Sequence, residues 1–171
     1  MKNLILLLAL AASISASAQV DFDKKLKDLG ITLMPPSKPI ANYVKAVRTG
    51  NLIFLAGHGP TKPDGTYVTG KVGKDLTVEQ GYEAAKLTAI GLLSTLKAEI
   101  GDFNKVKRVV KMLGMVNCEP DFGDHPKVMN GCSDLLVAVF GEKGKHARSS
   151  VGMNSLPMNT SVEIEIIVEI E

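Results

Sequence analysis

The chain has 171 residues, of which 45% are apolar and 22% are charged, and its formal net charge is +2. This length and composition fit one globular domain without repeats or low-complexity stretches. Because a nucleic-acid or membrane surface needs a clear basic excess, the near-neutral charge argues against both as partners.

The first residues carry the pattern of an export signal. Lys2 precedes an unbroken apolar run at 4–12 and the small-x-small sequence Ala16-Ser17-Ala18. That order predicts a signal peptide at residues 1–18, removed before Gln19, and disfavours an uncleaved anchor. The run is also shorter than the roughly 20 residues of a membrane-spanning helix. We expect export to a bacterial periplasm, or secretion as the alternative, with no membrane contact after cleavage.

The mature chain divides into an N-terminal extension, residues 19–38, and one domain, residues 39–171. The extension contains an amphipathic segment at 21–29, and prolines favour an extended segment at 32–40. Short strands are predicted at 46–48 and 52–56, around a turn at 49–51. A loop at 57–65 and a brief strand at 67–69 follow.

Two helices and a strand follow in the second half. Residues 78–100 have helical apolar spacing, begin with a capping box of Thr77 and Gln80, and end before Gly101. Residues 106–116 are rich in β-branched side chains, which indicates a strand. After a loop at 119–126, residues 127–140 predict a second amphipathic helix.

The end of the chain alternates strictly between apolar residues and mostly glutamates over 162–170, which predicts a strand with one buried face. Residues 147–154 form another strand, and a hairpin between the two would set Arg148 opposite Glu163. The order of elements predicts an α+β two-layer sandwich, with a mixed sheet of five to six strands and two helices on one face. The helix-free face would carry Arg148 and the glutamates, so we expect an oligomer that covers it.

Most catalytic signatures are absent from the sequence. There is no nucleophile elbow and no phosphate-binding loop. His58, His125 and His146 lack metal-ligand spacing, and we expect neither a metal nor a cofactor. Cys118 and Cys132 leave a disulfide open as an alternative, because their geometry cannot be read from sequence.

Arg148 and Glu163 are the strongest candidates for chemistry. A guanidinium grips a carboxylate with two parallel hydrogen bonds, and a glutamate can activate a water or move a proton. A structural salt bridge across the strands is the alternative that the residues alone leave open.

Several segments together resemble the RidA family, also called YjgF. They are Ala147-Arg148-Ser149-Ser150-Val151, Leu156-Pro157, Val162-Glu163-Ile164-Glu165, Gly50-Asn51 to Gly57-His58, and Tyr43 with Ala46-Val47. Asn130 resembles a family asparagine on the second helix. The resemblance spans roughly residues 39–169.

The resemblance implies a chorismate-mutase-like fold and a homotrimer with clefts between subunits. It further implies hydrolysis of imino acids to 2-oxo acids and ammonia, as a 2-iminobutanoate/2-iminopropanoate deaminase. Arg148 would bind the substrate carboxylate and Glu163 would position the water. Gly57 would offer backbone groups, and Tyr43 and Asn130 would shape the cleft.

The sequence departs from the family pattern in three places: Ala56 stands for a serine, Ser150 for a cysteine and His58 for a glutamine. The loop at 119–127 is also longer than in compact members. Two alternatives therefore stay open. One is a periplasmic trimer that binds small carboxylates without turnover. The other, less favoured, is an endoribonuclease that uses the basic cluster Lys105, Lys107, Arg108 and Lys111.

Overall fold

The structure, a computed structural model, describes residues 19–36, 39 and 41–171. The predicted signal peptide at 1–18 lies outside the described residues. No helix in the described part of the chain is long and apolar enough to cross a membrane. The elements in chain order are α1 (Phe22–Asp28), β1 (Ala46–Thr49), β2 (Leu52–His58), α2 (Val78–Ile100), η1 (Phe103–Lys105), β3 (Val106–Asn117), α3 (His125–Phe140), η2 (Gly141–Gly144), β4 (Ala147–Met153), η3 (Pro157–Asn159) and β5 (Val162–Ile170).

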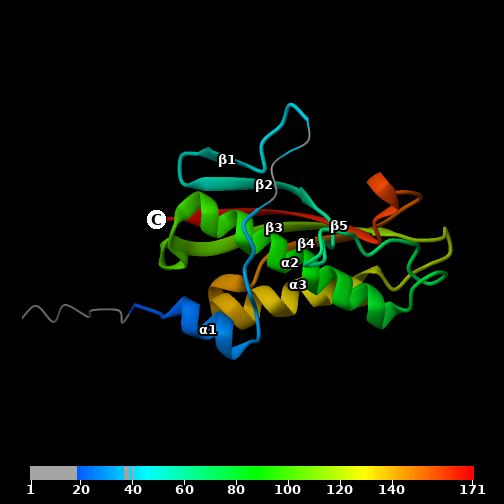
Figure 1. Ribbon diagram of the computed structural model, residues 1–171, viewed down its shortest axis with the longest axis horizontal. Helices are drawn as coiled ribbons and strands as arrows, with labels where there is room; N and C mark the ends of the chain where they lie inside the picture. The colour runs from blue at the N-terminus through cyan, green and yellow to red at the C-terminus, as the bar shows by residue number, and fades with distance from the viewer. Residues whose placement is uncertain (1–18, 37–38, 40) are drawn as a thin grey trace, which may run out of the picture.

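A five-stranded mixed sheet with the order β1-β2-β5-β3-β4 forms one layer. Figure 1 shows α2 and α3 running together along one face of this sheet, with α1 beside α3. All neighbouring strands are antiparallel except β3 and β4. The predicted α+β two-layer sandwich is confirmed, and the strand number falls within the predicted range.

The last strand, β5, is the centre of the sheet. Val162, Ile164, Ile166 and Val168 are nearly or fully buried on the helix-covered face, as the alternation predicts. Glu163 and Glu165 lie on the helix-free face, as predicted, where Glu165 is exposed.

The predicted hairpin between β4 and β5 is wrong. Strand β3 lies between them, pairing with β5 on one side and with β4, in parallel, on the other. The reason is the helix that precedes β4. A strand, a crossover helix and a second strand form a parallel pair, so α3 returns the chain beside β3. Residues 154–161, which include η3, then carry the chain past β3 to the centre of the sheet.

Local signals in the sequence set the helix ends closely. Thr77 Oγ1 accepts from Gln80 N at 3.2 Å, and Gln80 Oε1 accepts from Thr77 N at 2.8 Å, so the capping box is confirmed. Gly101 ends α2 with a φ of +76°. The second helix starts two residues earlier than predicted, at His125, because proline is well tolerated in a first helical turn, where Pro126 lies.

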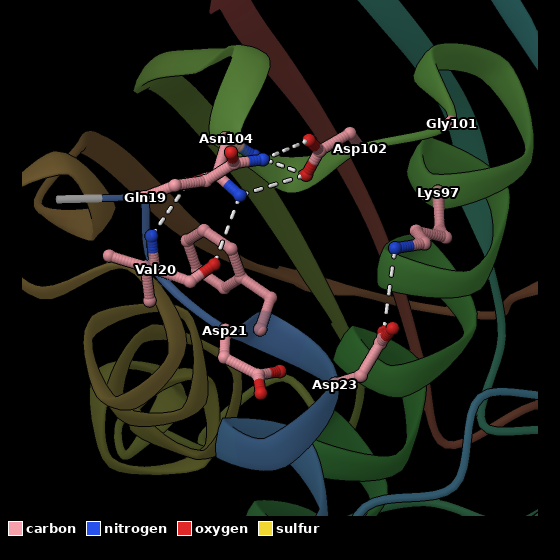
Figure 2. Close-up of a pocket in the computed structure, with 9 residues that line it drawn as sticks. Gln19, Val20, Asp21, Asp23, Lys97, Gly101, Asp102 and Asn104 are labelled. Atoms are coloured by element: carbon pink, nitrogen blue, oxygen red, sulfur yellow. Dashed lines mark hydrogen bonds and ion pairs between the residues drawn. The ribbon is translucent and has the colours of Figure 1, made fainter.

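The segment after Gln19 packs against the fold. The Phe22 ring lies 5.7 Å from the rings of Phe103 and Phe140, which are themselves 5.4 Å apart between centroids. Val20 N donates to Asn104 Oδ1 and Asn104 Nδ2 donates to Val20 O, both at 3.0 Å (Figure 2). Aromatic packing and the two hydrogen bonds between the Val20 backbone and the Asn104 side chain therefore hold this segment to the domain.

Replacing Phe22 with alanine is expected to lower the free energy of unfolding by about 2–3 kcal/mol, because two buried aromatic neighbours lose their partner. Lys24→Ala is the matched control on the exposed side of the same helix, and little change is expected there. Urea denaturation at one protein concentration measures both. Equal stability of the two variants would contradict the anchoring role.

Candidate functional site

Arg148 on β4 is bound to the N-terminal half of α3. Its Nη1 donates to Asn130 Oδ1 at 2.9 Å and to Ser133 Oγ at 3.0 Å, and its Nη2 lies 3.4 Å from the Pro126 carbonyl oxygen. Arg148 also lies opposite the fully buried Met112 in the parallel pair, so both face the helices. The prediction that Arg148 lies on the helix-free face is therefore wrong.

Glu163 on β5 lies against the backbone of β2. A Cβ added to Gly57 would overlap Glu163 Oε1, so only glycine lets the carboxylate lie so close. The β2–β5 register is irregular between Leu55 and His58, which brings Gly57 out of the regular ladder. Burial raises the pKa of Glu163, and the nearby Glu165 carboxylate raises it further. A raised pKa favours the protonated form of this carboxyl group and suits it to proton transfer.

Tyr43 lies near the same end of the β1–β2 pair as Gly57. It lies three residues before the start of β1, and the Lys45 carbonyl accepts from Ala56 N, next to Gly57, at 2.9 Å. The Tyr43 side chain is half exposed. The predicted site residues therefore fall into two groups, which we call the arginine group (Arg148 and Asn130) and the glutamate group (Glu163, Gly57 and Tyr43).

The two groups do not meet within one chain. Arg148 lies beside Met112 of β3, while Glu163 lies beside Met115 on the other side of that strand. Strand spacing and rise then put their Cα atoms roughly 14 Å apart. Arg148 faces the helices and Glu163 faces away from them, so neither a salt bridge nor a shared pocket forms between them in the monomer.

Comparison with known proteins gives the family. Residues 23–170 match the family model described as "YjgF/chorismate_mutase-like, putative endoribonuclease". The chain belongs to the YjgF family, also called RidA. This confirms the resemblance found in the sequence.

The relatives differ in the function that their names give. Protein TCP17 of Trypanosoma cruzi is 40% identical, over 92% of this chain and 98% of its own. A 2-iminobutanoate/2-iminopropanoate deaminase of Dermatophagoides farinae is 29% identical, over 78% and 90%. The crystal structure of Atu1372 from Agrobacterium tumefaciens, a protein with unknown function, is 44% identical over 88% of this chain and 94% of that one, with a TM-score of 0.81.

His58, which stands where the family pattern has a glutamine, is buried. His58 is 7% exposed, its Nδ1 bonds the Ala56 carbonyl at 2.7 Å, and its Nε2 bonds Thr95 Oγ1 on α2 at 2.8 Å. Burial lowers the pKa of His58 to about 4. The ring is therefore neutral at pH 7 and ties the irregular part of β2 to the helix layer.

The two cysteines are both free and buried. Burial raises the pKa of the Cys132 thiol to about 12, and Cys118 Sγ lies 3.4 Å from His125 Nε2. No third histidine, cysteine or carboxylate completes a metal-ligand cluster among the described residues.

The basic residues at the end of η1 and on β3 are hydrogen-bonded or ion-paired within the fold. Lys107 and Arg108 both pair with Glu169, at 2.7 and 3.0 Å. Lys105 donates to the Ile100 carbonyl oxygen, and Lys111 Nζ donates to a serine hydroxyl of β4. These contacts give no support to a nucleic-acid surface on this strand.

A hollow of about 450 Å³ lies where residues 19–23 meet the ends of α2 and η1 (Figure 2). Its polar side chains already bond each other: Gln19 Nε2 donates to Asp102 Oδ2 at 3.2 Å, and Lys97 Nζ donates to Asp23 Oδ1 at 3.5 Å. The hollow is thus a seam between the N-terminal segment and the domain, away from both candidate groups.

Proposed function

We propose that this RidA protein is an imine deaminase, which hydrolyses 2-imino acids to 2-oxo acids and ammonia in clefts between the subunits of a homotrimer. The separation of the two groups of site residues carries the proposal. A cleft between two copies can join the arginine group of one subunit to the glutamate group of the next. The deaminase name of one relative supports the reaction.

The helix-free face of the sheet supports the assembly. Val47, Phe54, Val151 and Met153 are 36–53% exposed there, although they are large and apolar. A hollow of about 400 Å³ on this face is lined mainly by apolar residues of β1, β2, β3 and β5. The charged residues Lys111 and Glu165 also line it. Exposed apolar patches of this kind mark protein interfaces.

The reaction needs an anchor and one acid–base group. Arg148 binds the substrate carboxylate, which orients the imine carbon. Glu163 takes a proton from water as the oxygen adds to that carbon, and the C=N π electrons move to nitrogen. Glu163 delivers that proton to the nitrogen, which gives a carbinolamine. It then passes the proton of the carbinolamine hydroxyl to the nitrogen as the C–N bond breaks, which leaves the 2-oxo acid and releases ammonia. An imine carbon is already electrophilic, so these two residues can suffice without a metal or cofactor.

Arg148→Ala is expected to lower kcat/KM for imino acids by roughly a hundredfold, because a paired charged contact to the substrate is lost. The imino acids are generated in place by an amino-acid oxidase, and semicarbazide competes for them. Arg48→Ala removes an exposed arginine of β1 whose Nε donates to the Gly50 carbonyl oxygen of the adjacent turn, and full activity is expected.

A different outcome of that assay would favour the binding function. If wild-type protein hydrolyses no imino acid, but 2-oxobutanoate raises its melting temperature and not that of Arg148→Ala, the protein is a carboxylate-binding trimer. Ala56 and Ser150, which differ from the family pattern, weaken the case for turnover and so favour this alternative.

We also propose that the chain is exported and cleaved before Gln19. The pattern at 1–18 supports this. Mass spectrometry of the protein from a native-like host would show a mature chain that starts at Gln19. A chain that retains residues 1–18 would overturn it.

A further inference from the structure

Ser133 and His146 form a chain of hydrogen bonds that ends at Arg148, which we call the relay. His146 Nδ1 lies 2.7 Å from the Gly144 carbonyl oxygen, and its Nε2 lies 3.1 Å from Ser133 Oγ. A carbonyl oxygen only accepts, so Nδ1 carries the proton and Nε2 of the neutral ring is an acceptor. Ser133 then donates its hydroxyl proton to His146, and its oxygen accepts from Arg148 Nη1 at 3.0 Å.

The relay decides which donors of Arg148 stay available. Both hydrogens of Nη1 are used, one by Asn130 and one by Ser133, and Nη2 makes one long contact to the Pro126 carbonyl oxygen. Among the described residues, no hydrogen bond involves Nε. The guanidinium therefore presents its Nε edge, with one remaining Nη2 hydrogen, and that edge matches the two oxygens of a carboxylate.

We infer that Ser133 and His146 are positioning residues, which fix Arg148 so that its Nε–Nη2 edge receives the substrate carboxylate. This rests on the proposed function of Arg148 as the carboxylate anchor. Neither residue touches the substrate in this scheme. Their effect passes through the orientation of the guanidinium.

The relay depends on a neutral His146. Once protonated, Nε2 becomes a donor, and the Ser133 hydroxyl can no longer donate to it. Burial lowers the pKa of His146, and the Arg148 charge lowers it further. On η2, Lys145 pairs with Glu142 and Lys143 donates to the Val106 carbonyl; on α3, Asp134 accepts from Tyr82. Arg148 is thus the nearby cation that opposes protonation, and carboxylate affinity should fall as pH drops below the usual histidine range.

The test measures the Kd of 2-oxobutanoate by titration calorimetry between about pH 8 and about pH 5. For the wild type, Kd should rise toward low pH. Ser133→Ala and His146→Phe should raise Kd roughly tenfold at high pH and remove most of this pH dependence, because a bond to a charged group is lost. Ser133→Thr keeps the hydroxyl and should behave as wild type. KM for imino acids should follow Kd, with kcat little changed.

The outcomes separate this inference from the proposed function. If the wild type binds 2-oxobutanoate, Arg148→Ala does not, and no imino acid is hydrolysed, the deaminase proposal is overturned. The positioning role of Ser133 and His146 is then still tested by Kd. If Ser133→Ala and His146→Phe keep the wild-type Kd and its pH dependence, the positioning role is wrong, whatever the turnover. A lower melting temperature with unchanged Kd would mean a purely structural role. Absence of wild-type carboxylate binding would overturn both.

Discussion

A one-to-one mixture of Arg148→Ala and Glu163→Gln subunits, refolded together, should regain about a quarter of wild-type deaminase activity, although each variant alone should be nearly inactive. The reason is the separation of the arginine and glutamate groups. In the proposed cyclic trimer each cleft would take Arg148 from one subunit and Glu163 from the next. A cleft is intact wherever a Glu163→Gln subunit supplies the arginine and an Arg148→Ala subunit supplies the glutamate. Random assembly produces that pair in about a quarter of all clefts.

The control carries both substitutions on one chain, mixed with wild-type subunits. Clefts between subunits predict about a quarter of full activity for this mixture, whereas a site within one subunit predicts about half. Mass spectrometry under native conditions verifies that mixed trimers have formed. Mixed trimers that show no recovery in the first experiment would place the whole site in one subunit, against the geometry of β3, β4 and β5.

The elements of the fold could be predicted because their signals are local. The capping box at Thr77, the glycine at 101 and the alternation in β5 each act within a few residues. Strand pairing is not local, and the hairpin was wrong for that reason. The sequence β3-α3-β4 did contain the signal for a parallel pair, since a helix of this length is what such a crossover needs.

The candidate site was predictable only in part. Asn130 came from the family resemblance, and its bond to Arg148 depends on α3 covering the edge strand. Ser133 and His146 carried no sequence signal. One lies in the middle of a helix and the other just before a strand, and only the fold brings them together. The same holds for Gly57, whose contact with Glu163 requires the irregular β2–β5 register.

The buried His58 should make wild-type stability depend strongly on pH. Its pKa is about 4 in the folded protein against about 6.5 in an unfolded chain. Between these values the unfolded state binds more protons, so the free energy of unfolding falls as pH drops through that range. Integrated over the window, the loss is about 3 kcal/mol from this residue. Denaturant titrations at matched protein concentration, from about pH 7 to about pH 4, measure it.

His58→Gln isolates the contribution of this histidine. Glutamine does not titrate, its amide can still donate to the Ala56 carbonyl or accept from Thr95, and it is the residue typical of the family at this position. Protonation of carboxylates in acid also lowers the free energy of unfolding, but both proteins share these groups. Their contributions therefore cancel in the difference. Wild type should therefore lose about 3 kcal/mol more than His58→Gln over the same pH range. Parallel stability curves would mean that the ring protonates in the folded state as readily as in the unfolded chain. That result would contradict its burial between β2 and α2, since a ring at 7% exposure is largely removed from solvent and its two hydrogen-bond partners in the described chain, the Ala56 carbonyl and the Thr95 hydroxyl, carry no negative charge.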